Sequence, residues 1–460
     1  MINYFNFKKF DDDYLLTNDL GRYMFVSTSE LKALLTGTVN PNSDFGKKAI
    51  EEMFWYQGSS QAFSEHTIPY MRESKNYLFS ATSLHIFVVT NECNGECLYC
   101  QAQSGRKHSN RMDKKTAQKA VEFALQSPAK QMTFEFQGGE PLTNFDTIKF
   151  IIEYSKNNCK DKIIEYNIVS NLTLLTEKMM DFFKENNVSI CTSIDGNRQL
   201  QNINRPYKGK DSYDETTTKL LRLKEKKIKV NAIETTTKYN LNKSKELVDE
   251  YIKLGLDSIF IRPLTKLGKA DKNWDKIGYS STEFLDFYKE TLDYIIERNK
   301  EGVFLSEGHS CIFLRKILLN EPVNYMELRS PCGGAIGQIA YYYDGNIYTC
   351  DEGRMLSEMG DDSFKLGNVF EDNYKDLMES NCTKAMCIAS CLECLPYCNS
   401  CVYMPYCGAC PVINLAQDNN IFAQNPNEYR CEIYKGILDI LFEYIENEPE
   451  IVDIFNRWIM

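Results

Sequence analysis

The sequence predicts an α/β protein: six β/α units in a partial barrel, a small α+β module before them and a cysteine-rich region after them. Between residues 84 and 300, short apolar segments alternate six times with amphipathic helical segments. Strands regularly separated by helices form parallel sheets with right-handed crossovers, and six in series suit an open barrel. Eleven of the 17 cysteines fall between residues 332 and 431, which sets that region apart.

The composition excludes several classes of protein. The 460 residues include 53 Lys and Arg against 64 Asp and Glu, and the net charge of −11 argues against nucleic-acid binding. A hydrophobic content of 43% is that of a globular protein rather than a disordered one. No apolar run reaches the roughly 18 residues of a membrane span, and the acidic start MINYFNFKKFDDD does not resemble a signal peptide. We expect a cytoplasmic protein without membrane or nucleic-acid partners.

The chain divides into five expected parts. Residues 1–80 form an N-terminal module, with strand-like runs at 2–10 and 13–27, a turn at Asn18–Gly21, and a helix whose N-cap is predicted to be Ser29. The barrel spans 81–302. A bridging region follows at 303–331, then a cysteine-rich domain at 332–431 in which irregular loops are expected. Two amphipathic helices close the chain at 432–460.

Each barrel unit is predicted from its own apolar pattern. Strands are expected at 84–90, 132–137, 165–170, 189–194, 230–237 and 258–264, and helices at 114–126, 145–156, 176–187, 214–227, 243–255 and 282–300. In a β/α barrel the functional site lies at the C-terminal ends of the strands. The polar residues that follow the strands are therefore expected to share one mouth: the loop from Thr90 to Cys100, Gly138, Gly139, Glu140, Ser170, Asn171, Asp195 and Arg262.

One eight-residue segment at this mouth contains three cysteines: Cys93, Cys97 and Cys100. Three thiolates can hold three irons of a cubane cluster and leave the fourth iron open to a substrate or cofactor. The alternative is structural zinc, which needs four ligands. No fourth cysteine or histidine lies close to the three cysteines, since His108 is eight residues beyond Cys100. A Gly-Gly-Glu sequence lets backbone approach a ligand while its carboxylate accepts from an ammonium group, although such a sequence is equally common in tight turns.

The CxxxCxxC spacing with Tyr99 before its last cysteine, followed by GGEP and a Ser-Asn strand end, resembles the radical S-adenosylmethionine (SAM) superfamily. The resemblance implies a 4Fe-4S cluster held by the three cysteines, with SAM on the open iron. It also implies contacts to SAM from Gly138, Gly139, Glu140, Ser170 and Asn171. Tyr99, Asp195 and Arg262 are further candidates, and a purely structural role for Asp195 and Arg262 stays open.

The downstream cysteines resemble the SPASM domain of peptide-modifying radical SAM enzymes, which carries two auxiliary 4Fe-4S clusters. The resemblance assigns the first cluster to Cys332, Cys350 and Cys410, with Cys311 or Cys391 as a candidate fourth ligand. It assigns the second cluster to Cys398, Cys401, Cys407 and Cys431. The spacing before Cys410 is one residue shorter than usual, and a zinc ribbon around Cys398 and Cys401 is the alternative. A second CxxxCxxC, at Cys387, Cys391 and Cys394, is interpreted as a decoy because 66 residues follow it.

The segments from Tyr341 to Val369 and from Cys394 to Val412 look most like the maturases of His-Xaa-Ser peptide systems. The resemblance implies one-electron cleavage of SAM to a 5'-deoxyadenosyl radical, which abstracts hydrogen from a bound precursor peptide. A ferredoxin or flavodoxin would supply the electron. Asp351 matches the proposed base of sulfatase-maturating relatives, but it is equally a turn residue. The N-terminal module is either a precursor-peptide recognition element that binds a leader as an added strand or a plain capping extension.

Three functions follow as hypotheses. The first is modification of a ribosomally synthesised peptide. The second is sulfatase maturation or another protein modification by the same chemistry, which nothing in the barrel separates from the first. The third is a non-catalytic zinc-binding scaffold, which metal analysis distinguishes from the others. The sequence does not specify the target residue, the product, the electron donor or the oligomeric state.

Overall fold

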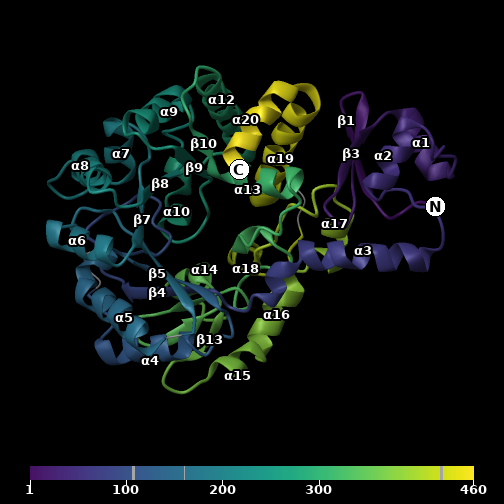
Figure 1. Ribbon diagram of the computed structural model, residues 1–460. Helices are drawn as coiled ribbons and strands as arrows, with labels where there is room; N and C mark the ends of the chain where they lie inside the picture. The colour runs from purple at the N-terminus through teal and green to yellow at the C-terminus, as the bar shows by residue number, and fades with distance from the viewer. Residues whose placement is uncertain (106–108, 160, 425–427) are drawn as a thin grey trace.

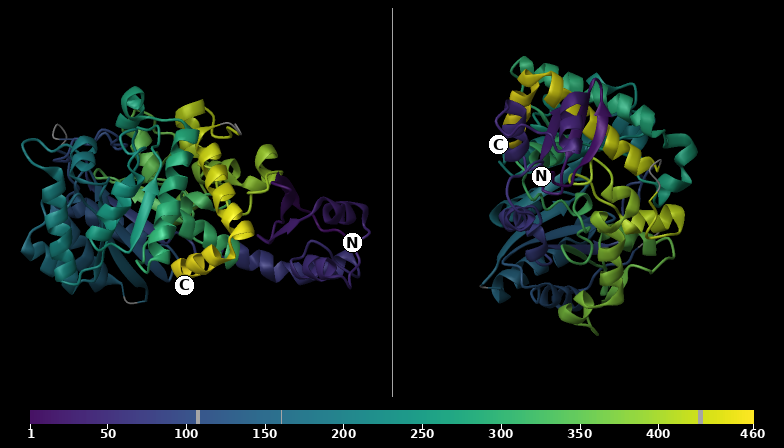
Figure 2. Two further views of the ribbon diagram at one scale, coloured as in Figure 1. Left: turned by 90° about the horizontal axis from the view of Figure 1, so that it is seen from above. Right: turned by 90° about the vertical axis from the view of Figure 1, so that its right-hand side faces the viewer.

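The computed structural model of this protein describes residues 1–105, 109–159, 161–424 and 428–460. His108 lies outside these ranges. The barrel occupies one side of the molecule, and the N-terminal module projects from the other (Figures 1 and 2). Helix α3 (Ser60–Ser74) runs between the two parts. The expected mixed α/β architecture is therefore confirmed.

Among the described residues, ten strands form the main sheet in the order β10-β9-β8-β7-β6-β5-β4-β11-β12-β13. Neighbours from β4 to β10 pair in parallel, as the alternating pattern predicts. The six predicted strands are β4 (Leu84–Thr90), β5 (Gln131–Gly138), β6 (Ile163–Val169), β7 (Val188–Ser193), β8 (Val230–Thr235) and β9 (Ser258–Arg262). A two-residue strand, β10 (Ser306–Glu307), extends the parallel series beyond β9.

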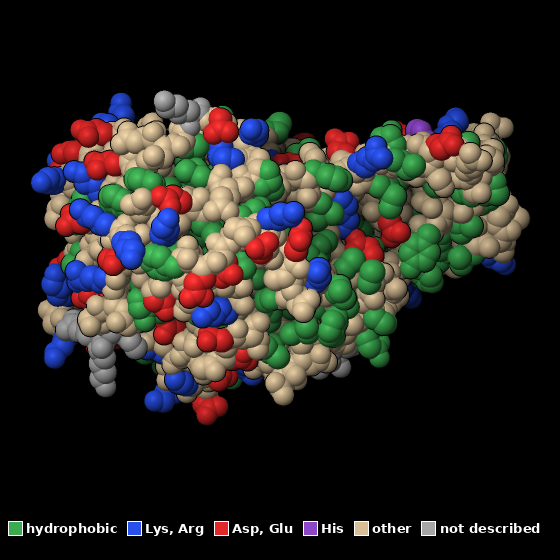
Figure 3. Space-filling view, turned by 90° about the horizontal axis from the view of Figure 1, so that it is seen from below, with side chains coloured by type: hydrophobic (Ala, Val, Ile, Leu, Met, Phe, Trp, Pro, Cys, Tyr) green, Lys and Arg blue, Asp and Glu red, His purple; other side chains and the backbone are tan. Residues whose placement is uncertain are grey.

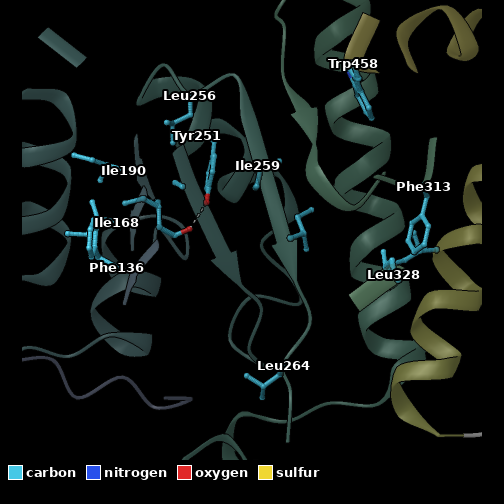
Figure 4. Close-up of a cluster of buried hydrophobic side chains, with 14 of the residues drawn as sticks. Phe136, Ile168, Ile190, Tyr251, Leu256, Ile259, Leu264, Phe313, Leu328 and Trp458 are labelled. Carbon is cyan, nitrogen blue, oxygen red and sulfur yellow. Dashed lines mark hydrogen bonds between the residues drawn. The ribbon is translucent and has the colours of Figure 1, made fainter. Parts of the chain in front are cut away.

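Amphipathic helices cover the outside of this sheet. Buried side chains alternate with less buried ones along β7 and β9, whereas β4 is buried at six successive positions. These helices are α4 (Lys114–Ala124), α5 (Phe145–Asn158), α6 (Glu177–Glu185), α8 (Ser212–Glu225), α9 (Ser244–Lys253) and α12 (Ser281–Lys300). Three short helices lie near the loop that follows β4: α7 (Arg198–Asn204), α10 (Lys269–Lys272) and α11 (Trp274–Ile277). Phe136, Ile168 and Ile190 come from successive strands and are almost fully buried (Figure 4). Tyr251 of α9 donates to the Ile194 carbonyl over 2.9 Å, which satisfies a buried hydroxyl.

Residues 303–431 are more regular than expected. Strand β11 (Gln338–Tyr341) pairs in parallel with β4, while β12 (Asn346–Tyr348) and β13 (Lys365–Asn368) continue the sheet antiparallel. The helices here are α13 (Gly308–Leu318), α14 (Asp351–Ser357), α15 (Tyr374–Met378), α16 (Asn381–Ser390), α17 (Pro396–Asn399) and α18 (Pro411–Asp418). Most of these elements are too short to show a period, so tertiary pairing stabilises what the local pattern does not predict.

The N-terminal module is an antiparallel three-stranded sheet with β2 (Asp13–Thr17) between β1 (Asn6–Phe10) and β3 (Tyr23–Val26). Helices α1 (Thr28–Thr36), α2 (Asp44–Glu51) and α3 follow. The predicted N-cap of α1 was wrong: the cap is Ser27 rather than Ser29. Ser27 forms a capping box with Glu30, which satisfies two free backbone N–H groups at once.

The C-terminal helices α19 (Tyr429–Asn447) and α20 (Pro449–Ile459) join the module to the barrel. Phe442 of α19 packs edge-on against Tyr23 and Phe25 of β3. Lys8 of β1 forms a 2.6 Å ion pair with Asp439 of α19. Because α19 and α20 also pack on α12 and α13, the module is held through them to the main body. Among the residues that the structure describes, no helix combines the length and apolar content needed to cross a bilayer.

The histidine of β4 gives the fold a testable pH dependence. His85 is fully buried; since the Thr82 carbonyl can only accept, Nε2 donates to it over 3.2 Å and Nδ1 accepts from the Tyr341 hydroxyl over 2.8 Å. Burial lowers the pKa of His85 to about 3. The unfolded chain therefore takes up a proton below pH 6.5 that the folded chain refuses, and stability falls as pH drops from 6.5 towards 3.

We expect the free energy of unfolding to fall by about 1 kcal/mol through this residue between pH 7 and pH 5.5. Urea unfolding at the two pH values measures this change. The change in the free energy of unfolding between pH 7 and pH 5.5 should be smaller by about 1 kcal/mol in His85→Gln than in the parent. Replacing the exposed His66 of α3 with Gln is the matched control and should leave the dependence unchanged. Equal pH dependence in His85→Gln and the parent would contradict the assignment.

Candidate metal and cofactor centre

The cysteine loop after β4 is held by backbone hydrogen bonds on both sides. On one side, the N–H groups of Gly139 and Glu140 donate to the carbonyls of Thr90 and Glu92 over 3.0 and 2.7 Å. A Cβ on Gly138 or Gly139 would lie 2.2 Å from a loop carbonyl oxygen. The Gly-Gly pair is therefore required by the close approach of the loop itself, whereas the sequence interpretation gave either the approach of a ligand or a tight turn as the reason.

The opposite side of the loop contacts the segment after α7. The N–H groups of Glu96 and Leu98 donate to the carbonyls of Pro206 and Asn204 over 3.1 and 3.0 Å. Gly95 packs so closely on Tyr207 that an added Cβ would lie 2.7 Å from its ring. The loop is thus clamped between two segments that lie more than 60 residues apart in the sequence.

The three thiols of this loop influence one another. Burial raises the pKa of Cys93, and the neighbouring Cys97 and Cys100 raise it further. Burial also raises the pKa of Cys97 to about 11, opposed by the positive charges of Arg205 and Lys269. A metal group would displace the thiol protons, and these two cations would offset part of the thiolate charge.

Across the described ranges, no three His, Cys, Asp or Glu side chains converge as the ligands of one metal ion do. The ligands of a single zinc lie within about 4 Å of one another because Zn–S bonds are about 2.3 Å long. The thiolates of a four-iron cluster each bind a different iron and lie further apart.

Three predicted residues meet at the ends of β5 and β6. Glu140 is fully buried and accepts from the Ser170 hydroxyl over 2.7 Å and from the Asn171 N–H over 2.8 Å. Burial raises the pKa of Glu140 to about 7 despite these hydrogen bonds. The Asn171 side chain also donates to Asn94 of the cysteine loop over 2.8 Å. A buried carboxylate beside the thiols is suited to accept from an ammonium group.

Asp195 and Tyr99 belong to a buried ion-pair network under the loop. Asp195 Oδ2 accepts from the Tyr99 hydroxyl over 2.6 Å and from Arg205 Nε over 3.0 Å. The Arg205 guanidinium lies 5.2 Å from the centre of the Tyr99 ring. Arg205 was not predicted as a site residue. Its pairing with Asp195 is visible only in the folded structure, and no local sequence pattern indicates it.

Proteins of known sequence match this chain over different extents. An uncharacterized protein of Methanocaldococcus jannaschii is 38% identical over 175 residues, 38% of this chain and 60% of that protein. The radical SAM cyclopropyl synthase TigE of Paramaledivibacter caminithermalis is 26% identical across 73% of this chain and 69% of TigE. A cysteine-type anaerobic sulfatase-maturating enzyme of Clostridium perfringens is 25% identical across 82% of this chain and 98% of that enzyme. The chain thus spans less than two thirds of the first of these relatives.

Solved structures share the fold. Native anSMEcpe with bound AdoMet matches with a TM-score of 0.68 at 20% identity, over 82% of this chain and 99% of that one. Streptococcus suis SuiB bound to precursor peptide SuiA matches with a TM-score of 0.55 at 16% identity, over 92% and 97%. The Radical SAM superfamily matches residues 87–251, from β4 to α9. The chain carries a radical SAM domain.

Radical SAM proteins use a 4Fe-4S cluster together with SAM. The residues at the mouth of this radical SAM domain fit both groups. Cys93, Cys97 and Cys100 form one mutually adjacent thiol set, and Glu140 offers a buried acceptor next to Cys93. Two cations near Cys97 suit a negatively charged group in this position.

Arg262, at the end of β9, lies in a charged network that sequence reasoning only partly found. Its guanidinium is 3.6 Å from Glu327, which also pairs with Arg430 over 3.0 Å. Burial alone would raise the pKa of Glu327, but Arg430 and Arg262 outweigh it and lower the pKa. These residues line a cavity of about 40 Å³ between the radical SAM domain and the cysteine-rich region, together with His309 and Tyr325. Glu327 and Arg430 were not predicted, because nothing local marks an ion pair between residues 103 positions apart.

Seven of the eleven downstream cysteines fall into two groups. Cys332, Cys350 and Cys410 are buried in one cluster. Burial raises the pKa of Cys350, and Cys410 and Cys332 raise it further. The second group lines a single cavity of about 130 Å³, which Cys410 also borders: Cys398, Cys401, Cys407 and Cys431. Burial raises the pKa of Cys407 to about 12, and the other three thiols of this group contribute. A thiol-lined cavity is a suitable cradle for a metal group.

The thiols of the two candidate fourth ligands make other contacts. Cys311 is on α13, where its thiol lies 3.8 Å from the Trp458 carbonyl. Burial raises the pKa of Cys311 to about 12, and the nearby Glu307 contributes. Cys391 Sγ lies 3.6 Å from Cys394 Sγ. Neither of these thiol contacts involves Cys332, Cys350 or Cys410. The described contacts therefore do not identify a fourth ligand for that group.

Asp351 begins α14 directly after Cys350 and is 7% exposed. Its Oδ1 accepts from Arg354 Nε and Nη2 over 3.1 and 2.5 Å. Arg354 is 1% exposed in this structure, so the pair is buried. Burial raises the pKa of Glu135 of β5, and the charge of Asp351 raises it further.

Proposed function

We propose that this chain is a peptide-modifying radical SAM enzyme that acts on a ribosomally synthesised precursor. The observation that carries the proposal is the arrangement of its thiols: one open set of three at the barrel mouth and two further sets in the cysteine-rich region. An open set supports cofactor binding, and the two additional sets support electron transfer away from the product.

Cys93, Cys97 and Cys100 would hold the SAM-binding cluster, and Glu140 would accept from the SAM ammonium group. When the 4Fe-4S cluster and SAM are bound, they supply hydrogen-atom abstraction by a 5'-deoxyadenosyl radical. Ser170 and Asn171 hold the Glu140 carboxylate in place through hydrogen bonds of 2.7 and 2.8 Å. The Asp195–Arg205 pair fixes Tyr99 and supports the cysteine loop from below, so its role is positioning rather than contact with SAM.

The cysteine-rich region would hold two auxiliary clusters, as SPASM domains do. Cys332, Cys350 and Cys410 would bind the first, and Cys398, Cys401, Cys407 and Cys431 the second. Arg262, Glu327 and Arg430 lie between this region and the barrel, where a peptide would enter. Their side chains would present polar groups to the backbone of a substrate.

The N-terminal module would bind the leader of the precursor as a strand added to an edge of its sheet, of which β1 and β3 are the edge strands. Figure 3 shows hydrophobic side chains gathered where the narrow N-terminal end joins the body of the molecule. The exposed apolar side chains of this part include Ile68 and Met71 of α3 and Phe79, which is 75% exposed. An exposed apolar surface of this kind is suited to bind a peptide.

Sulfatase maturation is the second candidate function. It is favoured by the match to the Clostridium perfringens enzyme, which extends over 98% of that protein. Both functions use the same barrel residues, so they differ in the substrate rather than in the radical chemistry.

Mass spectrometry of peptides co-expressed with this chain tests the proposal. A short precursor encoded beside it should gain a modification at one residue, and the same precursor without its leader should be modified far less. Modification of a sulfatase-derived peptide and not of the precursor would favour the second function. Little iron and stoichiometric zinc after anaerobic reconstitution would overturn both in favour of a zinc-binding scaffold.

Asp351 provides a more specific test of the site. If its carboxylate takes the substrate proton, Asp351→Asn should lower peptide product formation by roughly 10²- to 10⁴-fold. The amide oxygen can still accept from Arg354, so the fold and the cleavage of SAM without peptide should stay close to those of the parent. The exposed Asp344 is the matched control, and Asp344→Asn should retain full activity. Unchanged product formation in Asp351→Asn would show that Asp351 is only the first residue of its helix.

A further inference from the structure

The second CxxxCxxC sequence contains two thiols in contact. Cys391 precedes one turn of 3₁₀ helix at Leu392–Cys394, between α16 and α17, and Cys394 is the last residue of that turn (Figure 1). The Cys394 N–H donates to the Cys391 carbonyl over 2.9 Å, and the two Sγ atoms lie 3.6 Å apart. Cys394 is exposed and Cys391 partly exposed. Neither thiol faces the cavity of the second cysteine group.

We propose that Cys391 and Cys394 form a redox-active dithiol that closes to a disulfide by exchange with small-molecule disulfides. The turn places the two residues three positions apart, within the Cα separation that a disulfide spans. Bond formation at about 2.05 Å needs the sulfurs to approach by only about 1.5 Å. This function is independent of the proposed radical chemistry.

The exchange balances without any further reactant. The exposed Cys394 thiolate attacks one sulfur of an oxidised disulfide and releases one thiol. Cys391 then attacks the mixed disulfide and releases the second thiol. The protein loses two electrons and two protons as its S–S bond forms, and the small-molecule disulfide is reduced to two thiols.

Neighbouring hydrogen bonds hold this turn in shape. Glu393, between the two cysteines, pairs with Lys75 at the end of α3 and accepts from the Ser330 hydroxyl. The Leu392 N–H donates to the same hydroxyl over 2.9 Å. A turn anchored on both sides keeps the two sulfurs facing each other, which lowers the entropy cost of closing the bond.

The same anchors connect the dithiol to the first group of downstream cysteines. The Cys332 N–H donates to the Ser390 hydroxyl over 3.0 Å, one residue before Cys391. Cys332 is 4% exposed, whereas Cys394 is exposed. An oxidant in solution therefore meets the dithiol before it reaches the buried thiol behind it.

Anaerobic treatment of the reconstituted holoenzyme with oxidised glutathione tests the proposal. After alkylation of free thiols and digestion, we expect an intramolecular bond between Cys391 and Cys394, reversed by dithiothreitol, with the iron content of the parent. Cys382 of α16 is the matched control, because it is partly exposed and its thiol contacts the Ser363 carbonyl at 3.6 Å rather than a second sulfur. It should carry at most a glutathione adduct.

Two results would overturn the proposal. One is a lasting glutathione adduct on Cys394, or no reaction, in place of the internal disulfide. The other is loss of about four irons in a Cys391→Ser, Cys394→Ser double variant, which would make these residues cluster ligands. The expected double variant keeps the iron content of the parent and forms no disulfide in this segment.

Discussion

Replacing Cys93, Cys97 and Cys100 together with alanine is expected to abolish SAM cleavage and to lower the iron content from about twelve to about eight per chain. The physical reason is that these three thiols form one mutually adjacent set at the barrel mouth, separate from the two downstream sets. Removing them takes away every protein ligand of the proposed SAM-binding cluster and leaves the other two sets complete. The measurements are release of 5'-deoxyadenosine and iron analysis after anaerobic reconstitution.

The matched control replaces three cysteines that belong to the decoy sequence: Cys387, Cys391 and Cys394. That variant loses the three cysteines of a CxxxCxxC sequence with the same spacing. It should retain both the iron content and the SAM cleavage of the parent. Retained cleavage in the Cys93, Cys97 and Cys100 variant would refute the site. Loss of all iron would show instead that the three sets do not assemble independently.

Asp195→Ala is expected to lower the free energy of unfolding by about 3–5 kcal/mol, because it leaves a buried guanidinium without its partner. Asp195 is fully buried, and the side chain of Arg205 is 11% exposed. The variant also deprives the Tyr99 hydroxyl and the Thr235 N–H of their acceptor. Urea unfolding, followed by circular dichroism under anaerobic conditions, measures the change.

The surface pair of Asp211 with Arg198 gives the control for this variant. The Arg198 and Asp211 side chains are 54% and 33% exposed, so Asp211→Ala removes a solvated ion pair. It also removes the N-cap of α8, in which the Asp211 side chain accepts from the Asp214 N–H, and the variant should cost only about 1 kcal/mol. A similar small effect for Asp195→Ala would mean that Arg205 finds water or another partner. The positioning role proposed for this pair would then be withdrawn.

Much of the barrel could be predicted because its determinants are local. The strand at 84–90 coincides with β4, and the helix at 282–300 differs from α12 by one residue at its start. Apolar spacing reports such elements directly, since each side chain is buried on the face that its own position dictates. The region after residue 303 was predicted less well, because strands such as β12 have three residues and depend on neighbours for their pairing.

The sequence by itself determined the order of the six β/α units and the spacing of the cysteines, because periodicity and covalent spacing are properties of adjacent residues. Only the tertiary structure decided which charges pair in the interior: Arg205 with Asp195, and Glu327 with Arg262 and Arg430. It also separated the thiols into sets and left Cys391 against Cys394. Such pairings are set by burial, where an unpaired charge is costly, and burial depends on how distant segments pack.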